Sequence, residues 1–322
     1  MNLSPDYQPL PIVGIGSCLA GNPVRYDGQT KAANGHVQRM LECFDARPFC
    51  PEMAIGLGVP RPPIQIVGEP DALRVVDVAT GELDVTVPLQ EFAHQVIEQT
   101  PRLSGYILVK GSPSCGFDRV KRYNNKGNVV AHDSQGMFAS TLAALDPLLP
   151  LEDDGRLNDP GLRESFVTRV YVYHQWHKLC ADGLSASSLI AFYSRYKYLV
   201  MAHHVPSYKS LGKLLANAGK ENIDALATEF IASLMTALSM RTSRRSHANV
   251  LFHLAGYLRK HIAPAERQRL SALIDQYRLS AIPLIVPITL LKHHFANHPN
   301  EYIAQQVFLN PYPDELQIRN VT

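Results

Sequence analysis

The hydrophobic periodicity of this chain changes near residue 160, and this change limits the folds that the chain can adopt. Residues 1–150 alternate short apolar runs of strand type with stretches in which apolar residues recur at helical spacing. From about Leu162 onward the strand signals nearly disappear, and amphipathic segments follow one another between Gly, Pro and Asn breaks. We therefore predict an α/β N-terminal domain with a mostly parallel sheet, followed by an all-α C-terminal domain.

Three short runs in the first half are predicted to be strands. They cover Ile12–Ile15, Arg47–Phe49 and Tyr106–Val109. Two alternating runs, LRVVDV and LDVTV, flank a short turn and predict a hairpin over Leu73–Val87. The spacing of apolar residues in Leu89–Glu98 predicts a helix.

The acidic segment LLPLEDDGRLNDP separates the two halves. It is rich in Pro and Gly and has no periodicity, so we predict a linker at residues 151–161 between domains at 1–150 and 162–322. The helices predicted after it are Leu162–Cys180, Ser185–His204, Tyr208–Ala218, Asn222–Ser239, Ser246–His261, Pro264–Leu279 and Pro283–His298.

The two halves carry opposite net charges. Residues 1–159 hold 13 Lys and Arg against 19 Asp and Glu, whereas residues 160–322 hold 18 against 10. Such a division is typical of a protein in which one half performs chemistry and the other attracts a polyanion such as RNA. The alternative is that two domains simply drifted to different charges.

No stretch of the sequence reaches the apolar length of a membrane span, and the N-terminus lacks the regions of a signal peptide. Five cysteines in 322 residues do not form the pattern of a secreted disulfide framework. We therefore expect a cytoplasmic protein without a membrane partner, and the sequence leaves its oligomeric state open.

Three of the five cysteines follow predicted strands. Cys18 comes after the first strand, Cys50 ends the second and Cys115 lies just beyond the third. Ligands of open parallel sheets bind outside the carboxyl ends of the strands, so we expect these three side chains at one edge of the sheet. Cys43 and Cys180 lack this context and are interpreted as packing residues.

Convergent thiolates favour a soft metal centre. A structural zinc site would need four ligands at CxxC-like spacing, and the sequence has no CxxC. A 4Fe–4S cluster with three cysteine ligands would leave one iron open for a substrate. The alternative to any metal is three small, buried core residues.

Three segments of the first half resemble the thiouracil desulfurase (TudS) family. They are SCLAGNPVRYDG around Cys18, FCPEMAIGLGVPRPP around Cys50 and LVKGSPSCGF around Cys115. The resemblance implies a 4Fe–4S cluster held by these three cysteines, with the fourth iron free to take the sulfur of the substrate. It also implies hydrolytic removal of sulfur from a thiolated pyrimidine.

The second half resembles the YbgA-type helical domain that is often fused to this family. Its marks are YKYLVMAHH, YKSLGKLL, HANVLFHLAGYLRK, IPLIVPITLLKHH and NPYPDEL. Two-domain members of this kind are associated with 4-thiouridine in tRNA. The resemblance therefore implies tRNA or a thiolated nucleotide as the substrate.

Four residues beside the cysteines are candidates for catalysis. Glu52 follows Cys50 closely and is the candidate to activate water or to move protons, unless it is only a helix N-terminal acid. Ser112 and Ser114 lie on the turn before Cys115, and we favour Ser112 as a hydrogen-bond donor to the pyrimidine. Lys110 would neutralise a cluster or, alternatively, pair with Asp118.

The basic residues of the second half cluster along the chain and are candidates for RNA binding. Tyrosines 193, 196, 198 and 208 interleave with them, a combination suited to phosphate contacts and base stacking. The alternative is an ordinary charged helix face with tyrosines packed below it. The candidates are Arg195, Lys197, Lys209, Lys213, Arg241, Arg244 and Arg245.

Two other functions remain compatible with a metal centre in this chain. A sulfur-inserting tRNA thiolase normally activates its pyrimidine with ATP, and the sequence has no P-loop GxxxxGK[ST]. A nucleic-acid-binding protein with a purely structural metal would not need an open iron or Glu52. Sulfur removal therefore explains more features of the sequence than either of these two alternative functions.

Overall fold

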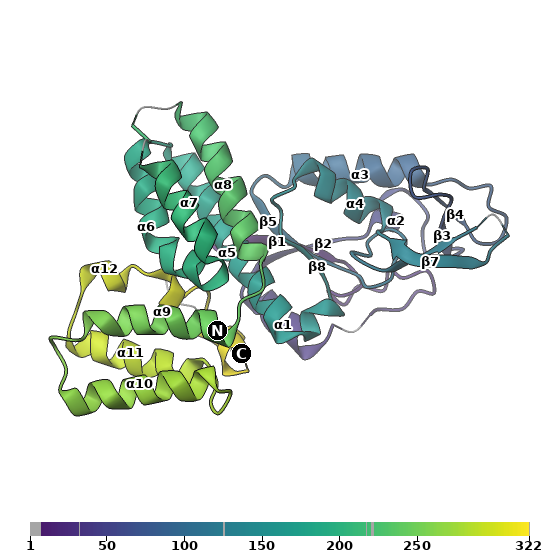
Figure 1. The fold of residues 1–322 in the computed structure, drawn as a ribbon. Coiled ribbons are helices and arrows are strands. Elements are labelled where there is room, and N and C mark those ends of the chain that lie inside the picture. Colours follow the sequence, from purple (N-terminus) through teal and green to yellow (C-terminus); the bar gives the residue numbers. More distant parts are fainter. Residues whose placement is uncertain (1–7, 32, 125, 217, 220–221, 322) are drawn as a thin grey trace. The chain divides into compact units, whose positions relative to one another are not determined.

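The chain changes from mixed α/β structure to helices at Asp159–Pro160 (Figure 1). The computed structural model describes residues 8–31, 33–124, 126–216, 218–219 and 222–321. Two units form, Met1–Asp159 and Pro160–Thr322, and all the strands of the described residues lie in the first. The predicted fold class is confirmed.

Sheet A of the first unit is entirely parallel. Its central strands are β1 (Ile12–Gly16) and β5 (Leu103–Leu108), with β2 (Asp45–Phe49) beside β1 and β8 (Leu151–Asp153) beside β5. All six residues of β5 are buried, as expected for a central strand covered on both faces. The three strands predicted from the sequence are thus neighbours in one sheet.

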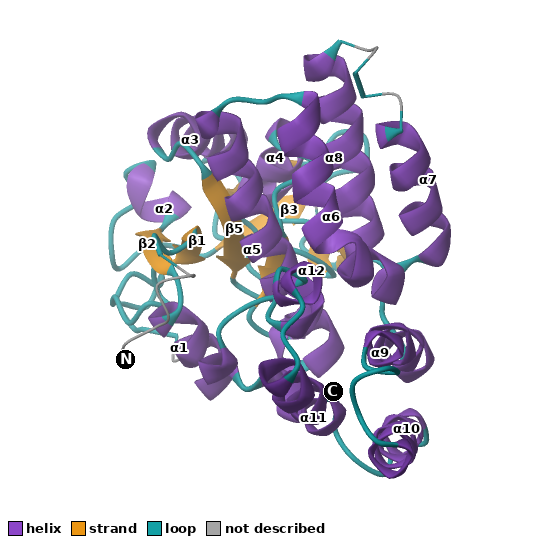
Figure 2. Cartoon of the chain, turned by 90° about the vertical axis from the view of Figure 1, so that its left-hand side faces the viewer, coloured by secondary structure: helices purple, strands orange, loops and turns teal. Residues whose placement is uncertain are grey.

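Helices cover both faces of sheet A. Helices α3 (Thr86–Gln99) and α4 (Met137–Leu145) lie side by side on one face and α1 (Gly35–Glu42) lies on the other (Figures 1 and 2). Asn34 caps α1 by accepting hydrogen bonds from the backbone nitrogens of His36 and Val37.

Four aromatic rings form the core between sheet A and this helical layer. Tyr106 of β5 stacks on Phe49 of β2 at a ring-centroid distance of 6.2 Å, and Phe138 of α4 meets Tyr106 edge-on at 5.6 Å. Phe92 of α3 stacks on Phe138 at 5.6 Å. A Cβ atom on Gly14 of β1 would run into the ring of Tyr106, so this strand position requires glycine.

Of a second sheet, sheet B, only one strand was predicted from the sequence, as the first arm of the hairpin. Its order is β4 (Arg74–Asp77), β3 (Ile64–Val67), β6 (Val120–Tyr123) and β7 (Val129–Ser134). The pairs at its two edges are antiparallel, and the central pair is parallel. Strands β3, β6 and β7 are short, which explains why their periodicity was not recognised.

The predicted hairpin over Leu73–Val87 forms with a shorter second arm than predicted. Its first arm forms β4, but beyond the turn only one bridge forms, between Val76 and Asp84, and α3 begins at Thr86. The hydroxyl of Thr86 accepts a hydrogen bond from the Val75 nitrogen at 2.8 Å. The second arm pairs with β4 only as far as Val85, whose nitrogen donates to the Val75 carbonyl oxygen at 2.8 Å, and the chain then enters α3.

The segment predicted as a linker begins with a strand. Leu151–Asp153 form β8, and the carboxylates of Glu152 and Asp153 are buried there. Arg156 donates to Glu152 at 2.6 Å, and the backbone nitrogen of Lys110 donates to Asp154 at 2.8 Å. The acidic side chains therefore accept hydrogen bonds at the edge of sheet A, and the segment is not the solvent-exposed linker that was predicted.

The second unit confirms all seven predicted helices, with ends that differ by a few residues (Figure 2). Ser185 and Ser243 start α6 and α9 with reciprocal capping boxes. The helices are α5 (Pro160–Asp182), α6 (Ala186–His203), α7 (Val205–Leu215), α8 (Ile223–Ser239), α9 (Arg244–Tyr257), α10 (Pro264–Arg278), α11 (Ile285–Asn297) and α12 (Glu301–Ala304).

No single helix of the described residues has the length and hydropathy to cross a membrane, although α8 and α9, which meet at 118°, pass that test as a pair.

A buried ion pair ties the C-terminal segment to α5. The guanidinium of Arg319 donates to Glu164 at 3.3 Å and to the carbonyl oxygen of Phe308 at 2.7 Å. The hydroxyl of Tyr312, from the NPYPDEL segment, donates to the same carboxylate at 3.1 Å. All these side chains are buried, so removal of one partner leaves an uncompensated charge.

Replacement of Arg319 by Met should lower the free energy of unfolding of the helical unit by about 3–5 kcal/mol, because Glu164 loses its countercharge. Urea unfolding followed by the fluorescence of Trp176, the one tryptophan of the chain, measures this effect on α5. The control is Lys292→Met, which removes an exposed pair with Asp314 and should cost less than about 1 kcal/mol. Equal effects of the two variants would contradict a structural role for the buried pair.

Candidate active site

The carboxyl ends of three neighbouring strands of sheet A carry the three cysteines. Gly16 at the end of β1 lies opposite Phe49 at the end of β2, and β5 flanks β1 on its other side. Cys18 follows β1, Cys50 follows β2 directly, and Cys115 lies on the turn after β5. Parallel pairing therefore brings together residues that lie far apart in the sequence.

Ser112 organises the turn that carries Cys115. Its hydroxyl oxygen accepts hydrogen bonds from the backbone nitrogens of Cys115 at 3.1 Å and Ser114 at 3.2 Å. The same hydroxyl lies 3.6 Å from the sulfur of Cys115. The turn closes where the Val109 nitrogen donates to the carbonyl oxygen of Cys115 at 3.1 Å, and Gly111 supplies the positive φ of 74°.

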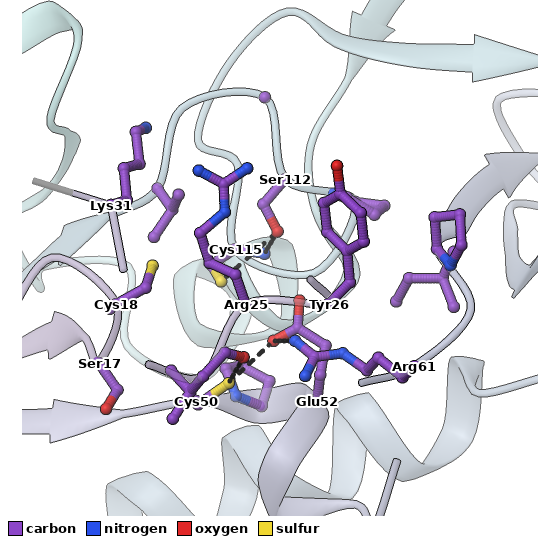
Figure 3. A pocket seen from close by; sticks show the side chains of 18 of the residues that line it. Ser17, Cys18, Arg25, Tyr26, Lys31, Cys50, Glu52, Arg61, Ser112 and Cys115 are labelled. Carbon is purple, nitrogen blue, oxygen red and sulfur yellow. Dashed lines mark hydrogen bonds and ion pairs between the residues drawn. The ribbon is translucent and has the colours of Figure 1, made fainter. Parts of the chain in front are cut away.

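The cysteines line one cavity of about 280 Å³ (Figure 3). Residues from three segments of the chain surround the sulfur atoms. The other walls of the cavity include Arg25, Tyr26, Lys31, Glu52, Arg61, Lys110 and Ser112.

The three thiols are free of disulfides, and their surroundings favour the protonated form. Burial, followed by the charge of Glu52, raises the pKa of Cys18, raises that of Cys50 to about 12 and raises that of Cys115 well above its ordinary value. A bound metal reverses this preference, because a coordinating thiol loses its proton.

The donor set fits a cluster better than a single ion. Three sulfur donors are soft ligands, of the kind that iron–sulfur clusters use. Among the residues that the structure describes, no three His, Cys, Asp or Glu side chains converge closely enough for one metal ion. A cavity of about 280 Å³ with sulfur on its walls suits a larger group that bridges them.

Glu52 lies beside the cysteines, as the sequence predicted. It occupies the first turn of the short helix α2 (Pro51–Ala54), and its carboxylate lies 3.4 Å from the sulfur of Cys50. Only 12% of its side chain is exposed. A half-buried carboxylate next to the sulfur atoms is placed to exchange protons within the cavity.

Arg61, which was not predicted from the sequence, is the partner of Glu52. Its guanidinium lies 3.9 Å from the Glu52 carboxylate and donates to the carbonyl oxygen of Gly58 at 2.9 Å. The side chain is 6% exposed, so it is a buried cation at the site. Its position between prolines in GVPRPP, close after Glu52, was the available signal.

Lys31 is a second cation that the sequence analysis missed. Its ammonium group pairs with Asp154 at 2.9 Å and so joins the cavity wall to the residue after β8. The sequence offered no signal for this pair, since its members lie on distant segments.

The structure separates the two candidate serines. Ser112 lines the cavity, whereas Ser114 is fully buried, does not line it, and has a hydroxyl without a hydrogen-bond partner among the described residues. Lys110 lines the cavity with its side chain against Gly155. Asp118, proposed from the sequence as its partner, pairs instead with Arg156 at 3.1 Å.

The basic candidates of the helical unit divide into two groups. Arg244 donates to the carbonyl oxygens of Tyr277 at 3.2 Å and Ile282 at 3.1 Å, so the fold engages it. Lys197 holds its ammonium group 4.7 Å from the ring centroid of Tyr302. The remaining candidates are exposed: Arg195, Lys209, Lys213, Arg241 and Arg245.

The interleaved tyrosines do not offer the predicted stacking surface. Tyr193, Tyr196 and Tyr198 are buried, and the hydroxyl of Tyr193 donates to the carbonyl oxygen of Tyr208 at 2.6 Å. Tyr193 and Tyr196 share one face of α6, and Tyr198 begins the run Tyr198–Ala202, in which every residue is buried. The alternative interpretation, tyrosines packed below a charged face, is therefore the correct one for these three.

Comparisons with known proteins match the two units separately. A family model described as 2-thiouracil desulfurase matches residues 13–154, and one described as a protein of unknown function, DUF1722, matches residues 197–313. The uncharacterized protein YbgA of Escherichia coli (strain K12) is 34% identical over 158 residues, which are 49% of this chain and 94% of YbgA.

Two further comparisons concern the first unit. The uncharacterized protein YbbK of Bacillus subtilis (strain 168) is 34% identical over 135 residues, 40% of this chain and 87% of YbbK. A solved structure of the [4Fe-4S]-dependent thiouracil desulfidase TudS shares 33% identity, with a TM-score of 0.36, over 46% of this chain and 93% of that one.

The site-bearing unit is thus of the desulfurase class, and the matched region spans all three cysteines and Glu52. The chain belongs to the 2-thiouracil desulfurase family through its first unit and to the YbgA family through its helical unit.

Proposed function

We propose that this chain removes sulfur from a thiolated pyrimidine by hydrolysis. In the reaction, water replaces the sulfur of a C=S group, so that the products are a C=O group and hydrogen sulfide. The observation that carries the proposal is the meeting of three free cysteines and the Glu52 carboxylate in one cavity. Membership in the 2-thiouracil desulfurase family supports it.

Cys18, Cys50 and Cys115 would hold a 4Fe–4S cluster as its three protein ligands. When bound, such a cluster supplies an iron without a protein ligand, which is a Lewis acid with affinity for sulfur. The three sulfur atoms line one cavity and none is in a disulfide, which favours this assignment.

Glu52 is the group that we assign to proton transfer. Its carboxylate takes a proton from the attacking water and returns it to the departing sulfur. Arg61 keeps this carboxylate in place through the 3.9 Å ion pair. Ser112, whose hydroxyl lies at the cavity wall, would orient the pyrimidine by a hydrogen bond.

We assign 4-thiouridine, in tRNA or as a nucleotide, as the substrate. The exposed basic side chains of the helical unit support RNA as the carrier of the pyrimidine. Lys209 and Lys213 are the best candidates for phosphate contacts. They are four residues apart on α7, so both lie on one exposed face of this helix.

Anaerobically prepared protein should be brown and contain about four irons per chain. Replacement of Cys18, Cys50 or Cys115 by Ser should remove the chromophore, because each variant loses a ligand. Cys180→Ala, at an exposed position on α5, is the matched control and should retain both colour and iron. Stoichiometric zinc without iron after anaerobic reconstitution would contradict the cluster.

Glu52→Gln should leave the cluster spectrum intact and lower turnover by roughly a hundredfold or more, the scale of a general acid–base group. The measurement is the rate of sulfide release from a 4-thiouridine nucleotide. Glu69→Gln, at a carboxylate whose side chain is 83% exposed, is the control and should have ordinary turnover. Near-normal turnover of iron-loaded Glu52→Gln would assign Glu52 a structural role.

The double variant Lys209→Glu, Lys213→Glu should bind tRNA more weakly and with a shallower dependence on salt. Each lost phosphate contact flattens the slope of log K against log[salt] by about 0.9 for duplex regions. Arg244 is left unchanged, since its replacement would break hydrogen bonds within the fold.

Turnover of a small thiouridine nucleotide is the internal control for this variant and should not change, because the cavity residues belong to the other unit. Unchanged tRNA binding would exclude this face of α7 as an RNA contact.

A further inference from the structure

The hydroxyl of Tyr106 is a buried polar group that the fold does not use. The side chain is fully buried in the aromatic core of the first unit, and its oxygen has no hydrogen-bond partner among the described residues. A phenylalanine would fill the same space without burying an unsatisfied oxygen, so the hydroxyl indicates a partner that the protein itself does not supply. We propose that Tyr106 donates a hydrogen bond to a sulfur atom of the iron–sulfur cluster and thereby raises the reduction potential of the cluster. This inference rests on the cluster of the proposed function.

The ring of Tyr106 extends from the middle of sheet A toward the edge that carries the cysteines. Tyr106 lies opposite Gly14 in the pairing of β5 with β1, and its ring crosses β1 in the space that a side chain on this glycine would fill. Beyond β1 the ring stacks on Phe49, with 6.2 Å between the ring centroids. Phe49 pairs with Gly16 at the carboxyl end of β1, and Cys50 follows it. The hydroxyl end of the ring is therefore directed toward the site.

The charged groups of the site act on this hydroxyl from the other side of the cavity wall. Tyr106 does not line the cavity, but its neighbours Gly16 and Phe49 do. Burial raises the pKa of the hydroxyl well above its ordinary value, so Tyr106 keeps its proton and can donate it. The groups that raise this pKa further are, in order of their effect, Cys115, Cys50, Glu52 and Cys18. Tyr106 is thus within electrostatic reach of all three cysteines.

A donor at this place would change the electronic properties of the cluster. Hydrogen bonds to the sulfur atoms of an iron–sulfur cluster are among the factors that set its reduction potential, because they stabilise the more negative, reduced form. Such a bond is stronger in a buried environment than in water. The hydroxyl of Ser112 lies 3.6 Å from the sulfur of Cys115 at the cavity wall, whereas Tyr106 approaches from the core. Tyr106 therefore supplies a donor that solvent cannot replace.

The test is Tyr106→Phe, which removes the hydroxyl and keeps the ring. After anaerobic reconstitution, the variant should bind as much iron as the wild type and have a lower reduction potential, measured by a redox titration. Loss of one charge-assisted hydrogen bond should shift the reduction equilibrium about tenfold, which is about 59 mV for a one-electron couple. Tyr123→Phe, at a tyrosine on β6 of sheet B, is the matched control and should keep the wild-type potential.

A second measurement needs no metal. In the metal-free chain the hydroxyl of Tyr106 is buried without a partner, so Tyr106→Phe should raise the urea concentration at the midpoint of unfolding, followed by circular dichroism. A lower midpoint would show that the hydroxyl forms a stabilising hydrogen bond in the metal-free protein, and it would overturn the inference.

The outcomes separate this inference from the proposed function. If iron-loaded Tyr106→Phe releases sulfide and has the wild-type potential, the inference fails and the proposed function stands. If Tyr106→Phe has a lower potential but the wild type releases no sulfide from any thiolated pyrimidine, the proposed function fails and the hydrogen bond to the cluster stands.

Discussion

Parallel pairing of β1 with both β2 and β5 is the constraint on which the rest of this structure depends. It requires Gly14, because the ring of Tyr106 occupies the space that a side chain would fill. The pairing aligns three strand ends, and only then do Cys18, Cys50 and Cys115 meet around one cavity. In a parallel sheet these ends share an edge by geometry, whereas antiparallel neighbours would have sent them to opposite edges.

Buried charge is handled differently in the two units. At the cavity, Glu52 is paired with Arg61, and burial together with the Glu52 charge raises the pKa of the Cys18 and Cys50 thiols more than the neighbouring cations lower it. In the helical unit, Glu164 and Arg319 neutralise each other inside the fold. At the cavity, the thiols stay available to a ligand. In the helical unit, the ion pair connects the C-terminal segment to α5.

Much of this protein followed from the sequence alone, because the responsible signals are local. Helical spacing predicted all seven long helices of the second unit, and apolar runs predicted the central strands of sheet A. The position of each cysteine just after a strand predicted their common edge, and the chain itself places Glu52 next to Cys50. Each of these inferences needs only residues that are close in sequence, together with the rule that ligands bind at the carboxyl ends of parallel strands.

The rest was decided by contacts between distant segments. The turn after β5 directs Ser112 to the cavity and buries Ser114, although both flank the same proline. Arg244 was predicted to bind RNA, but its guanidinium donates hydrogen bonds to carbonyl oxygens of α10 and of the segment after it. The acidic segment at Leu151–Asp153 became a strand because β5 presented an unpaired edge. The sequence determines which residues lie on each helix or strand. Tertiary packing decides which of their side chains stay exposed, because the residues that bury them or bond to them belong to distant segments of the chain.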